Sequence, residues 1–198
     1  MRTKQILITL FLGIMATTAF SGHHEEEKTM QSSFADFEAF SQAMQGRWRS
    51  KIIWITDWPG FGKKGDEVTG YAEYQIAEGG KVLNGRMYAG PGTVTVIAYY
   101  DEGNKLIKET MVSSGGNVWN NTIFQRNGEW TYHVSGSTGD GKEITGWAKR
   151  VFTDDGQQHR WVGQWEIDGI ALDPLRDSFR RIGNYYTAVR PIQHNRPR

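Results

Sequence analysis

The hydrophobic pattern of this chain changes its period once, near residue 46. Between residues 34 and 44, phenylalanines recur at helical spacing, which predicts a short amphipathic helix with Ser33 as its N-cap. From Trp48 almost to the C-terminus, apolar and polar residues alternate with period 2, as they do in half-buried β-strands. The chain is therefore predicted to be all-β after one N-terminal helix.

The alternating segments follow one another through short turns. About ten such segments are present, and each connection has the glycine or Asx residues that are typical of hairpins. The predicted strands are 45–55, 67–77, 81–89, 93–100, 105–112, 117–124, 129–137, 142–152, 157–167 and 175–182.

A meander of this length has two ways to protect its edge strands. It can stack into a sandwich or close into a barrel. A sandwich normally uses long crossover connections, and the sequence shows only short ones. We therefore expect an antiparallel up-and-down β-barrel of about ten strands, formed by a single domain over residues 34–182, with the helix over one mouth.

The first residues have the pattern of a signal peptide. Arg2 and Lys4 precede an apolar run, and small residues follow at 19 and 21, so residues 1–21 are predicted to be cleaved on export to the periplasm or the medium. An uncleaved anchor is the alternative, but polar residues interrupt the apolar run before it reaches the ~20 residues of a membrane span. No integral membrane span is expected after cleavage.

Two further segments flank the expected domain. Residues 22–33 are polar and are predicted to form a flexible N-terminal segment. Residues 183–198 are predicted to form a C-terminal tail with a basic, proline-containing composition.

The composition excludes several classes of function. The net charge is +1, which argues against a nucleic-acid surface. The absence of cysteine excludes disulfides, thiolate nucleophiles and Cys-ligated metals. Aromatic residues make up 13% of the chain and include eight tryptophans, so the candidate site is sought among them.

The tryptophans suggest a ligand site inside the barrel. If the aromatic faces of the strands point inward, they line a central cavity for a small apolar or aromatic ligand. The helix would then act as a lid and loop 57–65 as part of the rim. The alternative is that the same rings simply fill the barrel. The candidate ligand-binding residues are Trp54, Tyr74, Trp130, Tyr132, Trp161 and Trp165.

Glycines on the same faces have two interpretations. Small residues there would leave space for a ligand, or they would mark bends where strands coil round the barrel. The glycines in question are Gly70, Gly136, Gly146 and Gly163.

Catalysis and haem binding are the chemical alternatives. The sequence has no G-x-S-x-G or H-E-x-x-H motif, and an enzyme would need at least two ionisable groups facing inward within hydrogen-bonding reach. Polar strand residues such as Asp177 fit outward positions equally well. His159 could ligate a haem, although its place near a strand end favours a solvent-edge position, and His133 is expected to point outward.

A third alternative is a structural or interaction module with a filled barrel. Such a module would be recognised by a contiguous exposed aromatic patch on the outer wall.

Short motifs along the chain resemble those of the calycin superfamily, which includes lipocalins and fatty-acid-binding proteins. More narrowly, the sequence is similar to bacterial lipocalin-like proteins of unknown function of the DUF1579 type. The motifs are Gly46-Arg47-Trp48, the run Gly80 to Gly85 with Leu83, Tyr99-Tyr100-Asp101 and the closing segment Asp177 to Arg181.

The resemblance implies an antiparallel barrel with a central cavity but no known reaction. It also implies that an arginine of the last strand, Arg180 or Arg181, packs over Trp48 in a cation–π contact. Gly46 and Trp48 would then belong to a closed floor. Under that interpretation, the ligand site lies at the opposite end, near loop 57–65.

Overall fold

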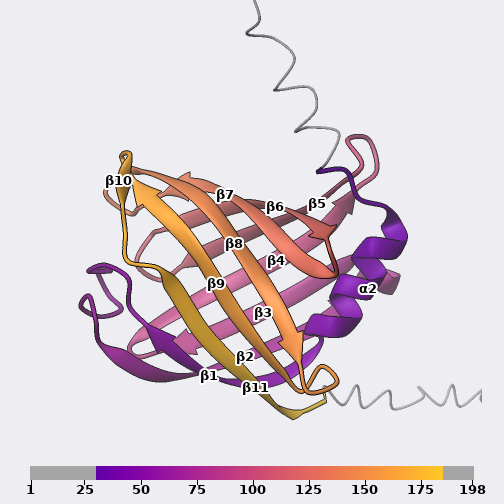
Figure 1. Cartoon of the computed structure of the whole chain (residues 1–198), viewed down its shortest axis with the longest axis horizontal. Helices are drawn as coiled ribbons and strands as arrows, with labels where there is room; N and C mark the ends of the chain where they lie inside the picture. Colours follow the sequence, from indigo (N-terminus) through magenta and orange to yellow (C-terminus); the bar gives the residue numbers. More distant parts are fainter. Residues whose placement is uncertain (1–29, 185–198) are drawn as a thin grey trace, which may run out of the picture.

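The computed structural model describes residues 30–184, which form a closed antiparallel β-barrel with a helix at one end (Figure 1). The sheet has 11 strands, of which ten close the barrel while β10 (Ile170–Ala171) only extends the end of β9. The barrel strands are β1 (Gly46–Ile53), β2 (Glu67–Ala77), β3 (Val82–Ala89), β4 (Gly92–Asp101), β5 (Leu106–Ser113), β6 (Val118–Arg126), β7 (Glu129–Ser137), β8 (Glu143–Thr153), β9 (Gln158–Ile167) and β11 (Leu175–Gly183).

The strand order confirms the predicted up-and-down barrel. Each strand from β1 to β9 pairs with the next one in the chain, and β11 lies between β9 and β1. Every long strand therefore has two partners, which removes the exposed edges. A 3-10 turn, η1 (Glu78–Gly80), joins β2 to β3. Burial alternates along the strands, as along β1, so one residue in two points into the barrel.

Both ends of the chain lie largely outside the described residues. The predicted signal peptide (1–21), most of the segment 22–33 and most of the tail 183–198 fall there. Ser32 corrects one expectation: it was placed in the flexible segment, but its amide donates to Lys105 O and its hydroxyl to Ile123 O. Gly183 belongs to β11 rather than to the tail. Within residues 30–184, no helix has the length and hydrophobicity needed to cross a membrane.

The helix α2 (Phe34–Met44) has the predicted bounds and the predicted cap. The Ser33 hydroxyl accepts from the Asp36 amide, and the Asp36 carboxylate accepts from the Ser33 amide, so both form a capping box. Phe37, Phe40 and Met44 are fully buried against the barrel interior. The helix therefore closes one end of the barrel (Figure 1).

Trp48 lies at this closed end and joins the helix to the last strand. Its indole N–H donates to Met44 O at 2.8 Å. The guanidinium of Arg181 lies 4.1 Å from the centre of the Trp48 ring and donates to the carbonyls of Ala43 and Gln45. These are helix C-terminal carbonyls without an intrahelical partner. Arg181 thus combines a cation–π contact with a C-terminal cap.

Of the two arginines that the sequence left open, Arg181 is the one over Trp48. Arg180, the other candidate, is exposed on the outer wall and pairs across the sheet with Arg49, so the inward role proposed for it is wrong. Gly46 lies at this closed end, as expected. Its φ is +121°, and a Cβ there would lie 2.6 Å from Arg181 Nη1. Only glycine fits beneath the guanidinium without strain.

Arg181→Ala is expected to lower the free energy of unfolding by about 1–3 kcal/mol, because a cation–π contact and two capping hydrogen bonds are lost together. Urea unfolding followed by circular dichroism measures the change. Arg180→Ala is the matched control and should stay within about 0.5 kcal/mol of the wild type, as exposed substitutions do. Equal effects of the two substitutions would contradict the assignment.

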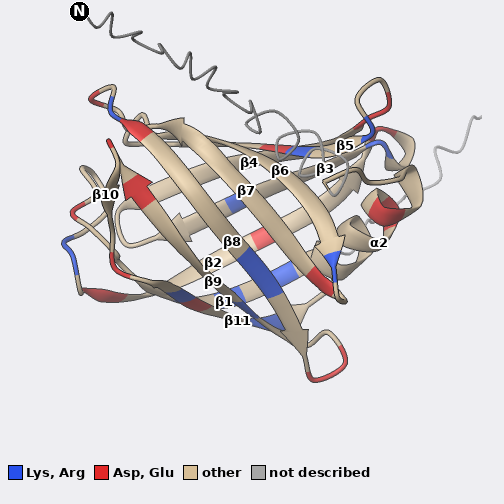
Figure 2. Cartoon of the chain, turned by 45° about the horizontal axis from the view of Figure 1, so that its top comes forward, with Lys and Arg blue, Asp and Glu red and all other residues tan. Residues whose placement is uncertain are grey.

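Charge is unevenly distributed over the outer wall, although the chain is nearly neutral overall. Strands β9, β11 and β1 carry much of the positive charge seen in Figure 2. Ser178 of β11 pairs with Arg160 on one side and with Lys51 on the other, and Lys51 is bridged to Glu67 at 2.8 Å. The exposed cations on β1, β9 and β11 are Arg47, Arg49, Lys51, Arg160, Arg176 and Arg180.

Candidate functional site

An apolar cavity lies at the end of the barrel opposite the helix. Its volume is about 80 Å³, several times the ~10–15 Å³ that one water molecule needs. The β1–β2 loop, drawn in purple in Figure 1, stands at this end, whereas α2 stands at the other. The lining residues are Ile52, Ile53, Trp54, Ile55, Trp58, Phe61, Met87, Ala89, Val94, Met111, Asn117, Trp119, Trp161, Trp165, Leu175 and Asp177.

The β1–β2 loop forms part of the cavity wall because it folds inward. Trp58 and Phe61 are each 6% exposed, although they belong to a loop. The Phe61 ring packs directly on Gly92, where a Cβ would collide with it, and the Pro59 carbonyl lies 2.5 Å from the Cβ position of Gly115. Glycines on neighbouring segments thus provide a flat surface that lets the loop dock closely. The loop rims the cavity as the sequence predicted.

Three of the six predicted ligand-binding residues line the cavity, namely Trp54, Trp161 and Trp165. The other three do not. Trp130 and Tyr132 pack against Phe40 of the helix, with ring centres 5.3 and 6.3 Å from it. Tyr74 is buried and pairs across the sheet with Gly46, the first residue of β1 after the helix. The barrel is therefore filled at the helix end and hollow at the other.

The helix does not act as the predicted lid. It covers the end that contains Trp48, while the cavity lies against the β1–β2 loop. The physical reason is that β1 starts at the helix and runs the length of the barrel before the loop begins. A residue at the start of β1 and a residue after its end must lie at opposite ends.

The cavity wall is a continuous set of aromatic rings. Trp58, Trp119, Trp165 and Trp161 follow one another with ring centres 5.8, 6.2 and 5.7 Å apart. Neighbouring rings in this set are inclined at 46–74°, within the range of favourable aromatic pairs. The sequence analysis did not single out Trp58, Phe61 or Trp119. Trp119 could have been found, because it is in phase with Ile123, which also faces inward.

Several lining residues carry N–H groups that have no hydrogen-bond partner among the described residues. They are the indole nitrogens of Trp54, Trp119, Trp161 and Trp165 and the amide nitrogen of Asn117. Each of these nitrogens is itself buried, so a ligand would meet ring surface before it met an N–H. The cavity therefore suits an apolar or aromatic body.

A buried polar cluster lies between the cavity and the helix end, and of its members only the tyrosines were predicted as site residues. Arg150 is 1% exposed, and its Nε donates to Tyr132 OH at 2.8 Å. Its guanidinium lies 4.4 Å from the ring centre of Trp161. On the other side of the barrel, Asn121 donates to Glu109 Oε1 at 2.8 Å, and Glu109 is also 1% exposed.

Burial and charge decide the protonation of this cluster. Burial raises the pKa of Tyr74 to about 12 and raises the pKa of Glu109, in both cases against the opposing effect of Arg150. Burial alone lowers the pKa of Arg150, but the attraction of the two tyrosines and of Glu109 outweighs it and raises that pKa overall. Arg150 therefore remains a cation.

Asp177 is the only ionisable side chain among the lining residues. Its Oδ1 accepts from the Ile53 amide at 3.1 Å, and no hydrogen bond engages Oδ2 among the described residues. Burial raises the pKa of this carboxyl to about 7, despite the opposing effects of the Ile53 amide and of Arg150. A carboxyl with such a pKa in a cleft is a candidate functional group.

The buried charges could have been recognised from the alternation. Glu109 is in phase with Ile107 and Met111, and Asp177 is in phase with Leu175 and Phe179. The same holds for Arg150, which follows the buried Ala148 at the next inward position. The direction of Asp177 was left open in the prediction from sequence, and Glu109 and Arg150 were not considered there; all three are buried on the inward face.

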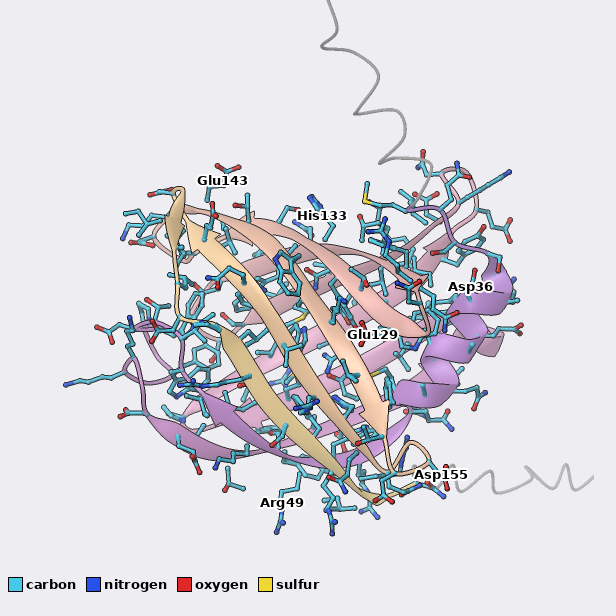
Figure 3. All side chains as sticks on the ribbon, viewed as in Figure 1. Asp36, Arg49, Glu129, His133, Glu143 and Asp155 are labelled. Carbon is cyan, nitrogen blue, oxygen red and sulfur yellow. The ribbon has the colours of Figure 1, made fainter. Side chains whose placement is uncertain are left out.

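The two strand histidines lie in different environments. His133 is exposed on the outer wall, as predicted (Figure 3). His159 is 1% exposed rather than at a solvent edge, and its ring stacks on Phe179 with ring centres 4.3 Å apart. Trp48 meets it at 4.7 Å. His159 does not line the cavity, so a haem held by it would not occupy the site described here.

The inward glycines mark close approaches rather than empty space. A Cβ at Gly136 would collide with the Val118 carbonyl, and one at Gly163 with the Trp147 carbonyl. Both glycines therefore let neighbouring strands bend round the barrel. Within residues 30–184, no group of three or more His, Asp and Glu side chains is arranged to hold a metal ion.

Comparisons with known proteins add no relative to this picture. No protein-family model matches the chain, and a search of curated proteins finds no match.

Proposed function

We propose that this protein is an exported, lipocalin-like barrel that binds a small apolar or aromatic ligand in the cavity behind the β1–β2 loop. The observation that carries the proposal is the aromatic wall of Trp54, Trp58, Trp119, Trp161 and Trp165 around a cavity of about 80 Å³. Concave sites lined by apolar and aromatic side chains with few polar groups are typical of ligand pockets. The signal-like residues 1–21 support export, to the periplasm or the medium.

The size of the cavity limits the ligand. About 80 Å³ accommodates a single ring or a short branched chain rather than a haem or a long acyl chain. The far half of the barrel adds no room, because Phe37, Phe40, Met44 and Trp48 are fully buried there. We expect a ligand no larger than a monosubstituted benzene, since an engineered apolar cavity of about 150 Å³ binds benzene.

The alternatives fit the described residues less well. The inward-facing pair that an enzyme requires is present in Arg150 and Tyr132, but neither residue lines the cavity. An interaction module predicts a contiguous exposed aromatic patch. Instead, the exposed Trp147 lies between His133 and Gln164. The outer aromatic pair of Tyr71 and Tyr88, with ring centres 6.1 Å apart, is limited to two rings because Arg49 and Thr93 flank it. We therefore propose binding rather than catalysis or a purely structural role.

The test uses benzyl alcohol as a neutral aromatic probe. Adding it to the wild type should change the intrinsic tryptophan fluorescence and raise the melting temperature, because binding to the native state stabilises it. Ala89→Phe adds a ring to the cavity wall and should weaken binding at least about tenfold by filling the space.

The matched control for this filling variant is Val112→Phe. Val112 is 47% exposed on the outer wall, so the same added ring should leave binding unchanged. If benzyl alcohol binds equally to the wild type and to the Ala89→Phe variant, the cavity is not the site.

A further inference from the structure

The cavity combines an aromatic wall with a single carboxyl group. Asp177 and Trp161 are directly paired across β11 and β9, both on the inward face, so their Cβ atoms stand about 5 Å apart. Asp177 retains one oxygen that no described donor engages, while the N–H groups of the lining residues are buried. The polar group available to a ligand is therefore an acceptor.

We propose that the ligand is a small protonated amine on an aromatic or compact apolar body, with its ammonium group held by the Asp177 carboxylate and its body by the tryptophan rings. This inference rests on the proposed function and specifies its ligand class. Tryptophan faces are the best cation–π partners among side chains. A desolvated carboxylate supplies the opposite charge and the hydrogen-bond acceptor that an ammonium group requires.

The charges inside the barrel favour a cationic ligand at this place. The ionisable groups that face the interior with Asp177 are Glu109 on β5, Arg150 on β8 and His159 on β9, besides two tyrosines. Glu109 and Arg150 attract each other across the barrel and offset each other's charge. Burial first, and then Arg150 and Arg181, lower the pKa of His159 well below its ordinary value, so it is neutral.

Arg150, the one fully buried cation on the described inward faces, attracts both carboxyls, so an ionised Asp177 adds a second buried negative charge to that of Glu109. An ammonium group in the cavity would neutralise it. A carboxylate ligand would instead place a second negative charge beside it. A neutral ligand would leave the ionised carboxylate desolvated and unpaired, which costs free energy.

The prediction is tested with benzylamine and benzyl alcohol, which have similar shapes and differ in charge. Isothermal titration calorimetry of the wild type should show benzylamine binding about tenfold tighter at pH 8 than at pH 6, because the carboxyl, whose pKa is about 7, ionises between these values. Benzyl alcohol should show no such increase. At pH 8 the amine should bind more tightly than the alcohol.

Two variants separate Asp177 from other causes of pH dependence. Asp177→Asn should weaken benzylamine binding at pH 8 at least about tenfold and remove its pH dependence, while benzyl alcohol binding persists. Asp155→Asn, at an exposed turn that projects from the barrel (Figure 3), should bind both probes like the wild type. The wild-type pH comparison does not depend on either variant folding.

The outcomes distinguish the two proposals. If benzyl alcohol binds in the cavity but benzylamine has neither preference nor pH dependence, the amine inference is overturned and the proposed binding function stands. If neither probe binds the wild type, the proposed function fails and the inference fails with it. If benzylamine binding depends on pH in the wild type and the Asp177→Asn variant loses this dependence, the result supports the proposed function and the amine inference together.

Discussion

Replacing Trp48 with alanine is expected to lower the free energy of unfolding by about 3–5 kcal/mol, the range found for buried aromatic side chains. Trp48 is fully buried, donates to Met44 O and stacks under Arg181. The substitution leaves a cavity at the closed end and removes the indole that joins α2 to β1. Because Arg181 also caps the helix, we expect α2 to exchange its amides faster as well.

Chemical denaturation gives the stability change, and hydrogen exchange resolved along the chain gives the effect on α2. Trp147→Ala is the control, since Trp147 is 48% exposed on the outer wall and should change stability far less. Similar losses for the two variants would show that Trp48 does not hold the closed end together. The ligand cavity lies at the other end, so benzyl alcohol binding to the remaining folded Trp48→Ala protein should persist.

Replacing Asp177 with asparagine is expected to increase stability at pH 8 by up to about 4 kcal/mol, because the pKa of this carboxyl rises from 3.8 to about 7 on folding. The folded state binds the proton more tightly than the unfolded state does. The contribution of Asp177 to stability is therefore fully present below pH 4 and is lost as the pH rises towards 7. Asparagine has no proton to lose and keeps an oxygen for the Ile53 amide.

Urea unfolding of the wild type and the Asp177→Asn variant between pH 4 and pH 8 measures this difference. The two curves should nearly coincide at the acidic end and diverge with rising pH, with the variant more stable. The pKa of Glu109 is also raised by burial, but it is present in both proteins and cancels in the comparison. Parallel curves, or a less stable variant at pH 8, would contradict the assignment.

These two predictions concern residues with opposite effects on stability at the two ends of the barrel. At the helix end, Trp48 and Arg181 form a cation–π contact with each other and both donate hydrogen bonds to carbonyls at the end of α2. These interactions stabilise the fold. At the cavity end, an ionised Asp177 reduces stability at neutral pH, and natural proteins retain such groups mainly where function requires them. The destabilising residue thus supports the proposal that ligand binds at the cavity end more clearly than any single tryptophan does.

The elements themselves could be predicted from the sequence because their signals are local. Helical spacing and the Ser33 cap predicted α2 with the bounds that the structure shows. Alternation and hairpin turns predicted β2 and β7 with the observed bounds as well. Both signals depend on residues only a few positions apart. The choice between Arg180 and Arg181 could have been made from the alternation, because Arg181 is in phase with the inward residues Asp177 and Phe179. The register shift between β1 and β11 comes only beyond this pair, between Trp48 and Arg47.

The site was only partly predictable, because an inward face does not say how far along the barrel a residue lies. Trp130 and Trp161 both face inward and are linked by register through Arg150. Trp130 nevertheless packs against the helix, and Trp161 lines the cavity. Strands in a barrel tilt against its axis, so neighbours in register lie at different heights. Only closure of the barrel establishes those heights.

By itself, the sequence determined that the chain forms one helix and a meander of hairpins with aromatic inward faces, since period and turn chemistry are properties of neighbouring residues. The tertiary structure alone decided where the cavity is and what charge it holds. Insertion of β11 between β9 and β1 brings Asp177 beside Trp161 and onto the amide of Ile53, 124 residues away in the chain. Burial among those partners, and not its place in the sequence, changes an ordinary aspartate into a carboxyl that titrates near neutral pH.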